Sequence, residues 1–197
     1  MQLLGKIVLL QIQTEPMKTG SGADRIYRTK PLRQINALRI TDKGVFGLTN
    51  DDQEVMDVHH VDHRASRNRG GANGLSFNFT GHYESMRQRF GEHIEDGFAA
   101  ENILIARDGV LPPETFASEQ VVIESATTGE QIRLIDVFDA APCEPFARFA
   151  VGEKEHGADL KATLQFLDNG RRGFYATLPR RQQNAVIRMG DKVYVVD

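Results

Sequence analysis

The chain has 197 residues and a mass of 22.0 kDa, enough for one substantial domain, and no proline- or serine-rich linker divides it. Its 24 basic and 27 acidic residues are nearly balanced, which disfavours nucleic acid as a ligand. No apolar run approaches the roughly 18 residues that span a bilayer, and no basic segment precedes an apolar one at the start. We therefore expect a single cytoplasmic domain over residues 1–197 that binds neither nucleic acid nor membrane.

The first fifty residues predict short strands around one long polar segment. Residues 7–12 form a β-branched and leucine-rich run with the length of a buried strand. Residues 14–33 predict a long surface loop whose spaced cations, among them Arg25 and Lys30, could line an anion site. A solvated loop without a ligand is the alternative. Residues 37–47 then alternate as a strand, a turn at Asp42-Lys43-Gly44 and further β structure.

The segment from residue 57 to residue 74 is unusually polar. Three of the six histidines lie within five residues, beside two aspartates: His59, His60, His63, Asp57 and Asp62. These side chains carry atoms that a metal ion accepts, but their spacing matches no specific zinc site. Three arginines lie beside the glycine backbone that follows: Arg64, Arg67 and Arg69. Such cations next to exposed backbone N–H groups could bind a phosphate instead.

The middle of the chain predicts a strand, a helix and a second strand. Residues 75–79 alternate as a strand, and Thr80 is a plausible N-cap for a helix that places Tyr83 and Met86 on its core-facing side. Glu101 and Asn102 directly precede the apolar strand of residues 103–106. Because burying either side chain without a partner is costly, we expect both to be hydrogen-bonded, in a loop cap or facing a pocket.

The second half predicts a hairpin that delivers the chain to its only cysteine. Residues 121–124 and 132–137 flank Thr127-Thr128-Gly129 and predict an antiparallel pair. Cys143 follows in a stiff turn between Pro142 and Pro145. A lone thiol fits a reducing compartment, and a buried apolar role is the alternative to a reactive one.

The remaining elements complete a mainly β pattern. Helical spacing after Cys143 and again over residues 160–167 is followed by a strand after Arg171-Arg172, and residues 186–196 predict two further short strands. Many short strands with two or three inserted helices indicate a closed β-barrel or a sandwich rather than an alternating α/β fold.

Seven separated pieces of the sequence occur in the order found in one known family. They are Lys30-Pro31, residues 57–60, Gly70-Gly71, residues 101–103, Pro142-Cys143, residues 170–173 and Gly190-Asp191. In this order the chain resembles the MOSC domain, named for the C-terminal domain of molybdenum cofactor sulfurase. The sequence departs from the family pattern at Ala100 and Met56, where relatives have glycine, and at Val58, where they often have a cation.

The resemblance implies a closed β-barrel, a molybdenum–pterin cofactor and Cys143 as the reactive group. In some relatives the cysteine ligates molybdenum, and N-hydroxylated compounds are reduced with electrons from a partner protein. In others it is thought to carry sulfur as a persulfide toward metal–sulfur centres. The implied partners are therefore an electron-transfer protein or a cysteine desulfurase, together with a small-molecule substrate. The alternative is a non-enzymatic protein that binds or delivers molybdopterin.

Carried over by position, the resemblance gives a set of candidate site residues. Cys143 is the metal ligand or sulfur carrier, and Asn102 is expected in the cofactor pocket beside Glu101. The remaining cofactor-binding candidates are His59, Lys30, Arg64, Arg67, Arg171 and Arg172. Because Glu144 should raise the pKa of the adjacent thiol, we expect Arg171 or Arg172 to offset it.

Overall fold

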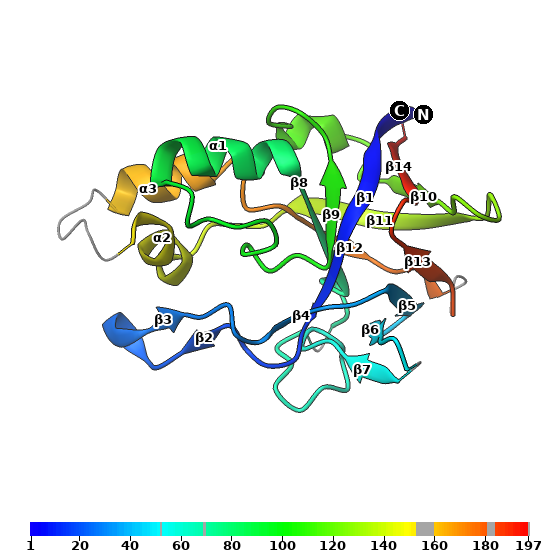
Figure 1. Cartoon of the computed structure of the whole chain (residues 1–197), viewed down its shortest axis with the longest axis horizontal. Coiled ribbons are helices and arrows are strands. Elements are labelled where there is room, and N and C mark those ends of the chain that lie inside the picture. Colours follow the sequence, from blue (N-terminus) through cyan, green and yellow to red (C-terminus); the bar gives the residue numbers. More distant parts are fainter. Residues whose placement is uncertain (52, 69, 153–159, 181–183, 197) are drawn as a thin grey trace.

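The structure is a computed structural model that describes residues 1–51, 53–68, 70–152, 160–180 and 184–196. Within these ranges, seven strands close into a barrel (Figure 1). In order of pairing they are β1 (Gln2–Gln13), β14 (Lys192–Val195), β10 (Val121–Glu124), β11 (Gln131–Asp139), β12 (Phe174–Thr177), β8 (Leu75–Phe79) and β9 (Ile103–Ala106), which returns to β1. The expectation of a mainly β, closed barrel is confirmed.

The long strand β1 closes the barrel. Its first residues pair with β14, so that Gln2 lies opposite Val195 and the two ends of the chain are neighbours. Its middle pairs with β9, and its last residues pair with β4 (Leu32–Gln34). Among the barrel pairs, only β8 and β9 run parallel. One strand therefore connects the barrel wall to the polar segments that follow it.

Aromatic and branched side chains fill the barrel. Phe174 lies against Phe77 with ring centroids 5.4 Å apart and against Phe116 at 4.4 Å. Phe77 and Phe174 are each 1% exposed. In β11 the alternation separates core-facing from exposed side chains, whereas all five residues of β8 are buried, polar Ser76 and Asn78 included.

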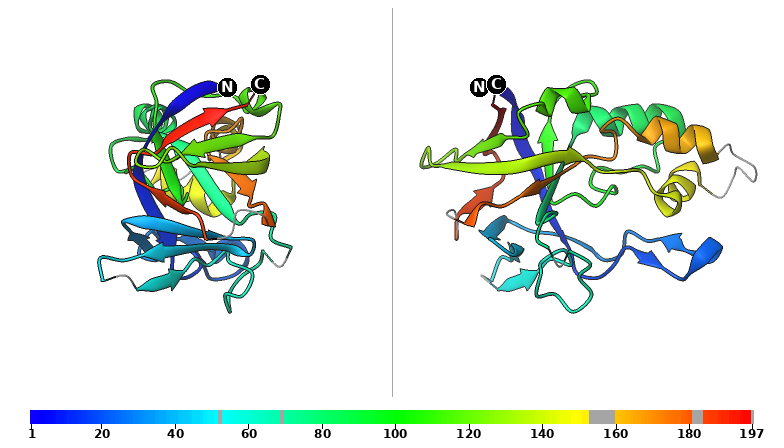
Figure 2. Two further views of the ribbon diagram at one scale, coloured as in Figure 1. Left: turned by 90° about the vertical axis from the view of Figure 1, so that its right-hand side faces the viewer. Right: turned by 180° about the vertical axis from the view of Figure 1, so that it is seen from behind.

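A second sheet lies below the barrel (Figure 2). It consists of β13 (Val186–Arg188), β5 (Ala37–Thr41), β6 (Gly44–Leu48) and β7 (Glu54–Met56), in that order. The predicted turn at Asp42–Gly44 joins β5 to β6. The polar segment of residues 57–74 leaves this sheet from β7 and returns to the barrel at β8.

Three α-helices of the described chain lie together at one end of the barrel (Figure 1). They are α1 (Thr80–Phe90), α2 (Glu144–Val151) and α3 (Leu160–Leu167). The predicted stripe of α1 forms part of a second core, where Tyr83 and Met86 are fully buried with Phe146 of α2. None of the described helices is both long and apolar enough to cross a membrane.

The expectation of one long loop over residues 14–33 is wrong in part. Lys18–Thr19 (β2) and Ile26–Tyr27 (β3) form a small antiparallel hairpin, joined through a short 3-10 helix at Gly22–Asp24; a second 3-10 helix is Pro113–Phe116. The hairpin is held down because Tyr27 lies 5.1 Å from the ring of Phe146, and only 7% of Tyr27 is exposed. The expected N-cap at Thr80 is also displaced by one residue, since Phe79 occupies that position.

We predict that Gly81→Ala destabilises the protein although alanine favours helices. A Cβ atom at Gly81 would lie 2.1 Å from the backbone oxygen of Gly109, which cannot rotate away. Overpacking of about 1–3 kcal/mol outweighs a helix-propensity gain of about 1 kcal/mol. Urea unfolding measures the difference, and Gly70→Ala is the matched control because open space surrounds its Cβ position. A more stable Gly81→Ala variant would contradict the close packing of α1 on this loop.

Candidate functional site

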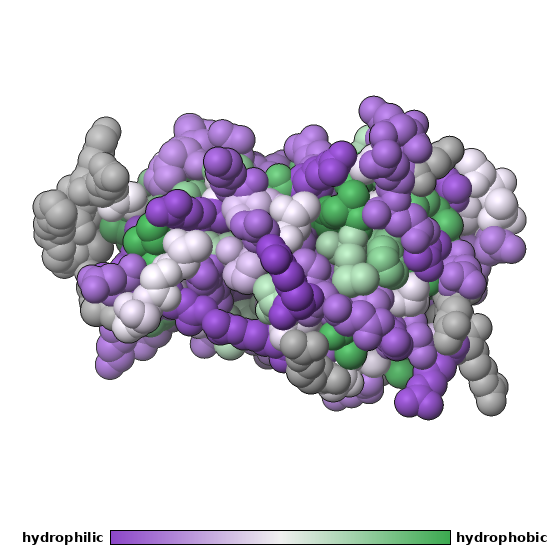
Figure 3. Space-filling view, turned by 90° about the horizontal axis from the view of Figure 1, so that it is seen from below, coloured by the Kyte–Doolittle hydropathy of each residue, from purple (hydrophilic) through white to green (hydrophobic). Residues whose placement is uncertain are grey.

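A cavity of about 150 Å³ lies between the β2–β3 hairpin, the segment after β7 and the loop before β9. Four cationic side chains line it: Lys18, Arg25, Arg67 and Arg172. Tyr27, Tyr175 and His59 supply aromatic walls, and no carboxylate is among the described residues that line it. The underside of the molecule, seen in Figure 3, is predominantly hydrophilic. The four cations that line the cavity attract an anionic ligand.

Cys143 is held next to this cavity as the N-cap residue of α2. The thiol is half-buried, and burial raises its pKa. The positive charges of Arg172 and Lys18, with hydrogen bonds from the Phe146 backbone and Lys18, outweigh that effect and lower the pKa of Cys143 below its ordinary value. The site therefore favours a thiolate, which is the nucleophilic and metal-binding form of cysteine.

Of the two arginines expected to offset Glu144, Arg172 is the one beside the thiol. Its guanidinium lies 3.9 Å from the ring centroid of Phe146 and donates a 2.6 Å hydrogen bond to the backbone oxygen of Ala99. Arg171 turns away and donates to the backbone oxygen of Phe166. Glu144 forms an ion pair with Arg148 on its own helix.

The glycines of residues 170–173 explain how Arg172 is placed. Gly173 has φ +91°, and a Cβ atom there would lie 2.7 Å from the backbone oxygen of Phe77. Only glycine allows this close approach without strain. The turn therefore presses against β8 and directs Arg172 toward the thiol and the cavity.

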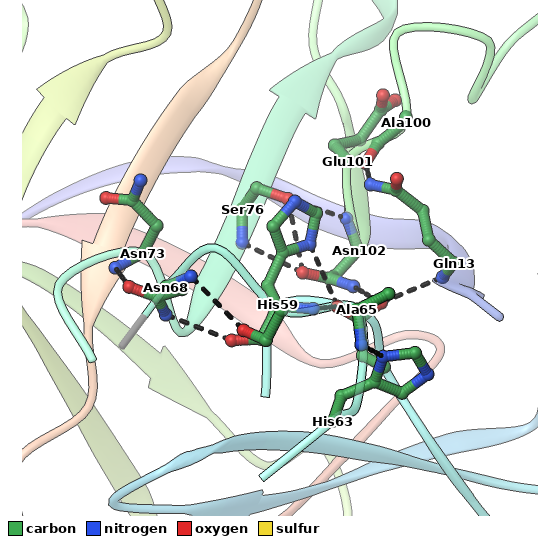
Figure 4. A network of polar contacts seen from close by, with 12 residues as sticks. Gln13, His59, His63, Ala65, Asn68, Asn73, Ser76, Ala100, Glu101 and Asn102 are labelled. Carbon is green, nitrogen blue, oxygen red and sulfur yellow. Dashed lines mark hydrogen bonds and ion pairs between the residues drawn. The ribbon is translucent and has the colours of Figure 1, made fainter. Parts of the chain in front are cut away.

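Asp57 is a buried carboxylate that contacts His59, and His59 in turn lines the cavity. The side chain of Asp57 is fully buried. Burial raises the pKa of Asp57, but hydrogen bonds from the ring and backbone of His59 and from the Gln13 backbone outweigh it and lower the pKa below its usual value. Asp57 Oδ1 lies 2.9 Å from His59 Nδ1. His59 is half-buried and lines the cavity (Figure 4).

Asn102 and Glu101 do not line this cavity. Asn102 donates to Asp57 Oδ2 at 3.1 Å and accepts the Ser76 backbone N–H at 3.0 Å, so its amide links the Asp57 carboxylate to β8. Glu101 accepts a 2.8 Å hydrogen bond from Tyr83 Oη, while its Oε1 has no hydrogen-bond partner among the described residues. Burial raises the pKa of Glu101 to about 7.

The other candidates divide between the cavity and the outer surface. Arg67 lines the cavity, whereas Arg64 is exposed and is not part of its lining. Lys30 lies at a separate cavity that Glu95 and Asp96 also line. Arg69 lies outside the described residues.

The structure thus brings together Cys143, Arg172, His59 and Arg67. It adds Lys18, Tyr27 and Tyr175, which the sequence analysis did not single out. The spaced cations of residues 14–33 were the signal available for this hairpin. Arg25, one of them, lines the cavity.

The cluster of histidines and aspartates does not form a metal site. Within the described parts of the chain, no three His, Cys, Asp or Glu side chains are arranged to hold a metal ion. His60 instead lies 3.3 Å from Thr41 Oγ1, and His63 Nδ1 accepts the backbone N–H of Ala65. His60 and His63 therefore make local contacts that help to fix the conformation of this segment.

We predict that Ala100→Gly preserves or increases stability. Ala100 has φ +70°, the left-handed conformation, in which an L side chain costs about 1–2 kcal/mol. Glycine removes this cost but loses about 0.5–1 kcal/mol to the greater entropy of the unfolded chain, so the expected gain is about 0–1.5 kcal/mol. Urea unfolding measures it. Ala99→Gly is the control, and it should lose stability because Ala99 does not have a positive φ.

We also predict a pH-dependent difference between Glu101→Gln and the parent protein. The unfolded carboxyl loses its proton near its ordinary pKa of 4.5, whereas the folded one keeps it to about 7. The parent therefore loses about 3 kcal/mol of stability as pH rises between these values, and the glutamine variant does not. Urea unfolding at pH 5 and pH 8 measures the change. Parallel curves for Glu101→Gln and the parent would contradict it, and exposed Glu92→Gln is the control.

Comparison with known proteins places this geometry in a family. The model of the MOSC domain matches residues 70–194, which is more than half of the chain. The match begins after β1, although β1 completes the barrel. No curated protein matches the sequence.

Two solved structures share the fold at low sequence identity. The YuaD protein from Bacillus subtilis superposes with a TM-score of 0.51 at 12% identity, over 96% of this chain and 97% of that one. A hypothetical protein superposes with a TM-score of 0.53 at 13% identity, over 99% of this chain and 70% of that one. These two likenesses show the fold, and the family model shows that the chain belongs to the MOSC domain family, which is associated with the molybdenum cofactor.

Proposed function

We propose that the protein serves molybdenum-cofactor-related chemistry as a sulfur carrier, with Cys143 holding the sulfur as a persulfide. The observation that carries the proposal is the Cys143 thiol at the N-cap of α2, where Arg172 and Lys18 lower its pKa beside a cation-lined cavity. A low-pKa, partly exposed cysteine near cations is the environment in which thiolates attack sulfur. The buried-thiol alternative is disfavoured because those cations favour the charged form.

The cavity also fits parts of a molybdenum–pterin cofactor. A soft thiolate suits a soft metal centre, and Lys18, Arg25 and Arg67 suit a phosphate group. When bound, the cofactor would supply a redox-active metal for the reduction of N-hydroxylated compounds. The cavity, at about 150 Å³, is smaller than the roughly 300–1,000 Å³ of most small-molecule sites. This size favours sulfur carriage at Cys143 and makes the molybdenum-ligand role the second candidate.

The proposed chemistry needs a partner. A cysteine desulfurase would supply the sulfur in the leading proposal, and an electron-transfer protein would supply electrons for reduction of a small-molecule substrate in the second. A single free thiol suits the reducing cytoplasm, where we place the reaction. The alternative is a non-catalytic protein that delivers molybdopterin. Unlike both catalytic proposals, it predicts that loss of the Cys143 thiol leaves cofactor binding nearly unchanged.

The test is persulfide formation and metal content in the parent and in Cys143→Ser. We expect glutathione persulfide to add one sulfur atom to the parent and none to the variant, as read by intact mass. One molybdenum per chain in protein from a molybdenum-replete host, lost in the variant, would favour the ligand role. A parent that takes up no sulfur would overturn the sulfur-carrier proposal.

We predict that Lys18→Met makes Cys143 less acidic. Removing a cation that hydrogen-bonds the thiol should move the pH midpoint of iodoacetamide alkylation upward. The matched control is Arg28→Met, an exposed cation on the adjoining segment that is not among the groups that shift the pKa of the thiol. An unchanged midpoint in Lys18→Met would show that the Lys18 charge does not stabilise the thiolate.

A further inference from the structure

Asp57 orients the ring of His59 by a hydrogen bond to Nδ1, which leaves Nε2 available for proton exchange. Asp57 accepts from the Gln13 backbone at 2.8 Å and from Asn102 Nδ2 at 3.1 Å on Oδ2. On Oδ1 it accepts from the His59 backbone at 2.8 Å and from His59 Nδ1 at 2.9 Å. An ionised carboxylate only accepts hydrogen bonds, so Nδ1 carries a hydrogen. Proton exchange is therefore left to Nε2.

The cavity connects His59 to the cations that surround the thiol. His59 lines the same cavity as Lys18 and Arg172, the two cations that stabilise the Cys143 thiolate. Figure 4 shows His59 with Asn68 on one side and Gln13 and Asn102 on the other. Asn68 Nδ2 donates to the His59 backbone oxygen at 3.0 Å, which fixes the backbone as well.

The other polar groups at the cavity are less suited to moving a proton. Arginine does not give up its proton in proteins, which sets aside Arg25, Arg67 and Arg172. Tyr27 donates to the Phe98 backbone oxygen at 2.9 Å, and burial, the largest of several effects, raises its pKa further. Tyr175 and Lys18 remain, and Lys18 is hydrogen-bonded to the thiol itself. Histidine is the side chain that exchanges protons near neutral pH.

We propose that His59 is the general acid for transfer of sulfur to Cys143, with Asp57 as its positioning residue. This inference rests on the proposed function. The Cys143 thiolate attacks the outer sulfur of a donor persulfide, and the donor S–S bond breaks. The electron pair of that bond goes to the departing sulfur, which takes a proton from Nε2 of the His59 imidazolium. The products are the Cys143 persulfide, a neutral thiol and neutral His59, with no net oxidation.

The test compares two reagents that differ in their need for an acid. Glutathione persulfide releases an alkyl thiolate, which departs faster when protonated, whereas iodoacetamide releases iodide, which needs no proton. For His59→Gln we expect about a 100-fold loss of rate with glutathione persulfide. With iodoacetamide we expect less than about a 3-fold change, well below the range of general acid catalysis.

Two further variants control the comparison. His63→Gln removes a second half-buried histidine of the same segment that does not line the cavity, and both of its rates should match the parent. Lys18→Met should slow both reagents together, because it acts on the thiolate. Equal slowing of both reagents in His59→Gln, or no slowing of either, would overturn the acid role.

The positioning role of Asp57 is read in the unmodified protein. Nitrogen-15 NMR of the imidazole should show the neutral His59 ring with its hydrogen on Nδ1, and a ring with its hydrogen on Nε2 would overturn the role of Asp57. The sulfur-carrier role of Cys143 and the acid role of His59 can be disproved separately. If the parent gains no sulfur at Cys143, the proposed function is wrong, and if His59→Gln gains it at the parent's rate, only the acid is wrong.

Discussion

The site depends on a buried negative charge that the fold must satisfy. A carboxylate taken out of water without partners costs several kcal/mol, so Asp57 can be ionised only if donors surround it. Those donors come from Gln13 at the end of β1, from His59 on the same segment and from Asn102 before β9. Two of these donors, Gln13 and Asn102, are 89 positions apart in the sequence. Satisfying one charge therefore ties the segment after β7 to the barrel and fixes one wall of the cavity.

Arg172 is a partly buried positive charge, which likewise needs partners inside the fold. Its Nε atom is enclosed, the ring of Phe146 lies under its guanidinium, and the backbone oxygen of Ala99 accepts one of its N–H groups. A cation in this position is stabilised by a nearby negative charge, and the Cys143 thiolate can provide it. The acidity of the thiol and the burial of the arginine thus support each other, and Lys18 adds to the effect from the hairpin.

The sequence predicted the strands and helices better than the contacts between them. The alternation of β11 corresponds to its burial, whereas all five residues of β8 are buried although its sequence alternates. The barrel prediction follows from many such short segments. The β2–β3 hairpin was missed because its anchors, Met17 and Tyr27, are two isolated apolar residues in a polar stretch. Cys143 and Arg172 were identified from their motifs. Lys18 was not, because its role arises only when a hairpin packs on α2, 125 positions away from Cys143 along the chain. Glu101 and Asn102 were expected to be hydrogen-bonded and are.

The loop before β9 explains why a family glycine can be replaced here. Ala100 keeps a positive φ of 70°, so the backbone follows the conformation that glycine would adopt most easily. Strain of this kind persists only where the surroundings fix the chain. Gln13 Nε2 donates to the backbone oxygen of Ala100 at 2.9 Å, and Gln11 Nε2 donates to those of Gly97 and Glu101. Arg172 holds the loop from the other side through Ala99. Because β1 and Arg172 bind neighbouring carbonyls of one loop, and the Gln13 backbone also donates to Asp57, the positions of Arg172, the loop and the Asp57–His59 pair depend on one another.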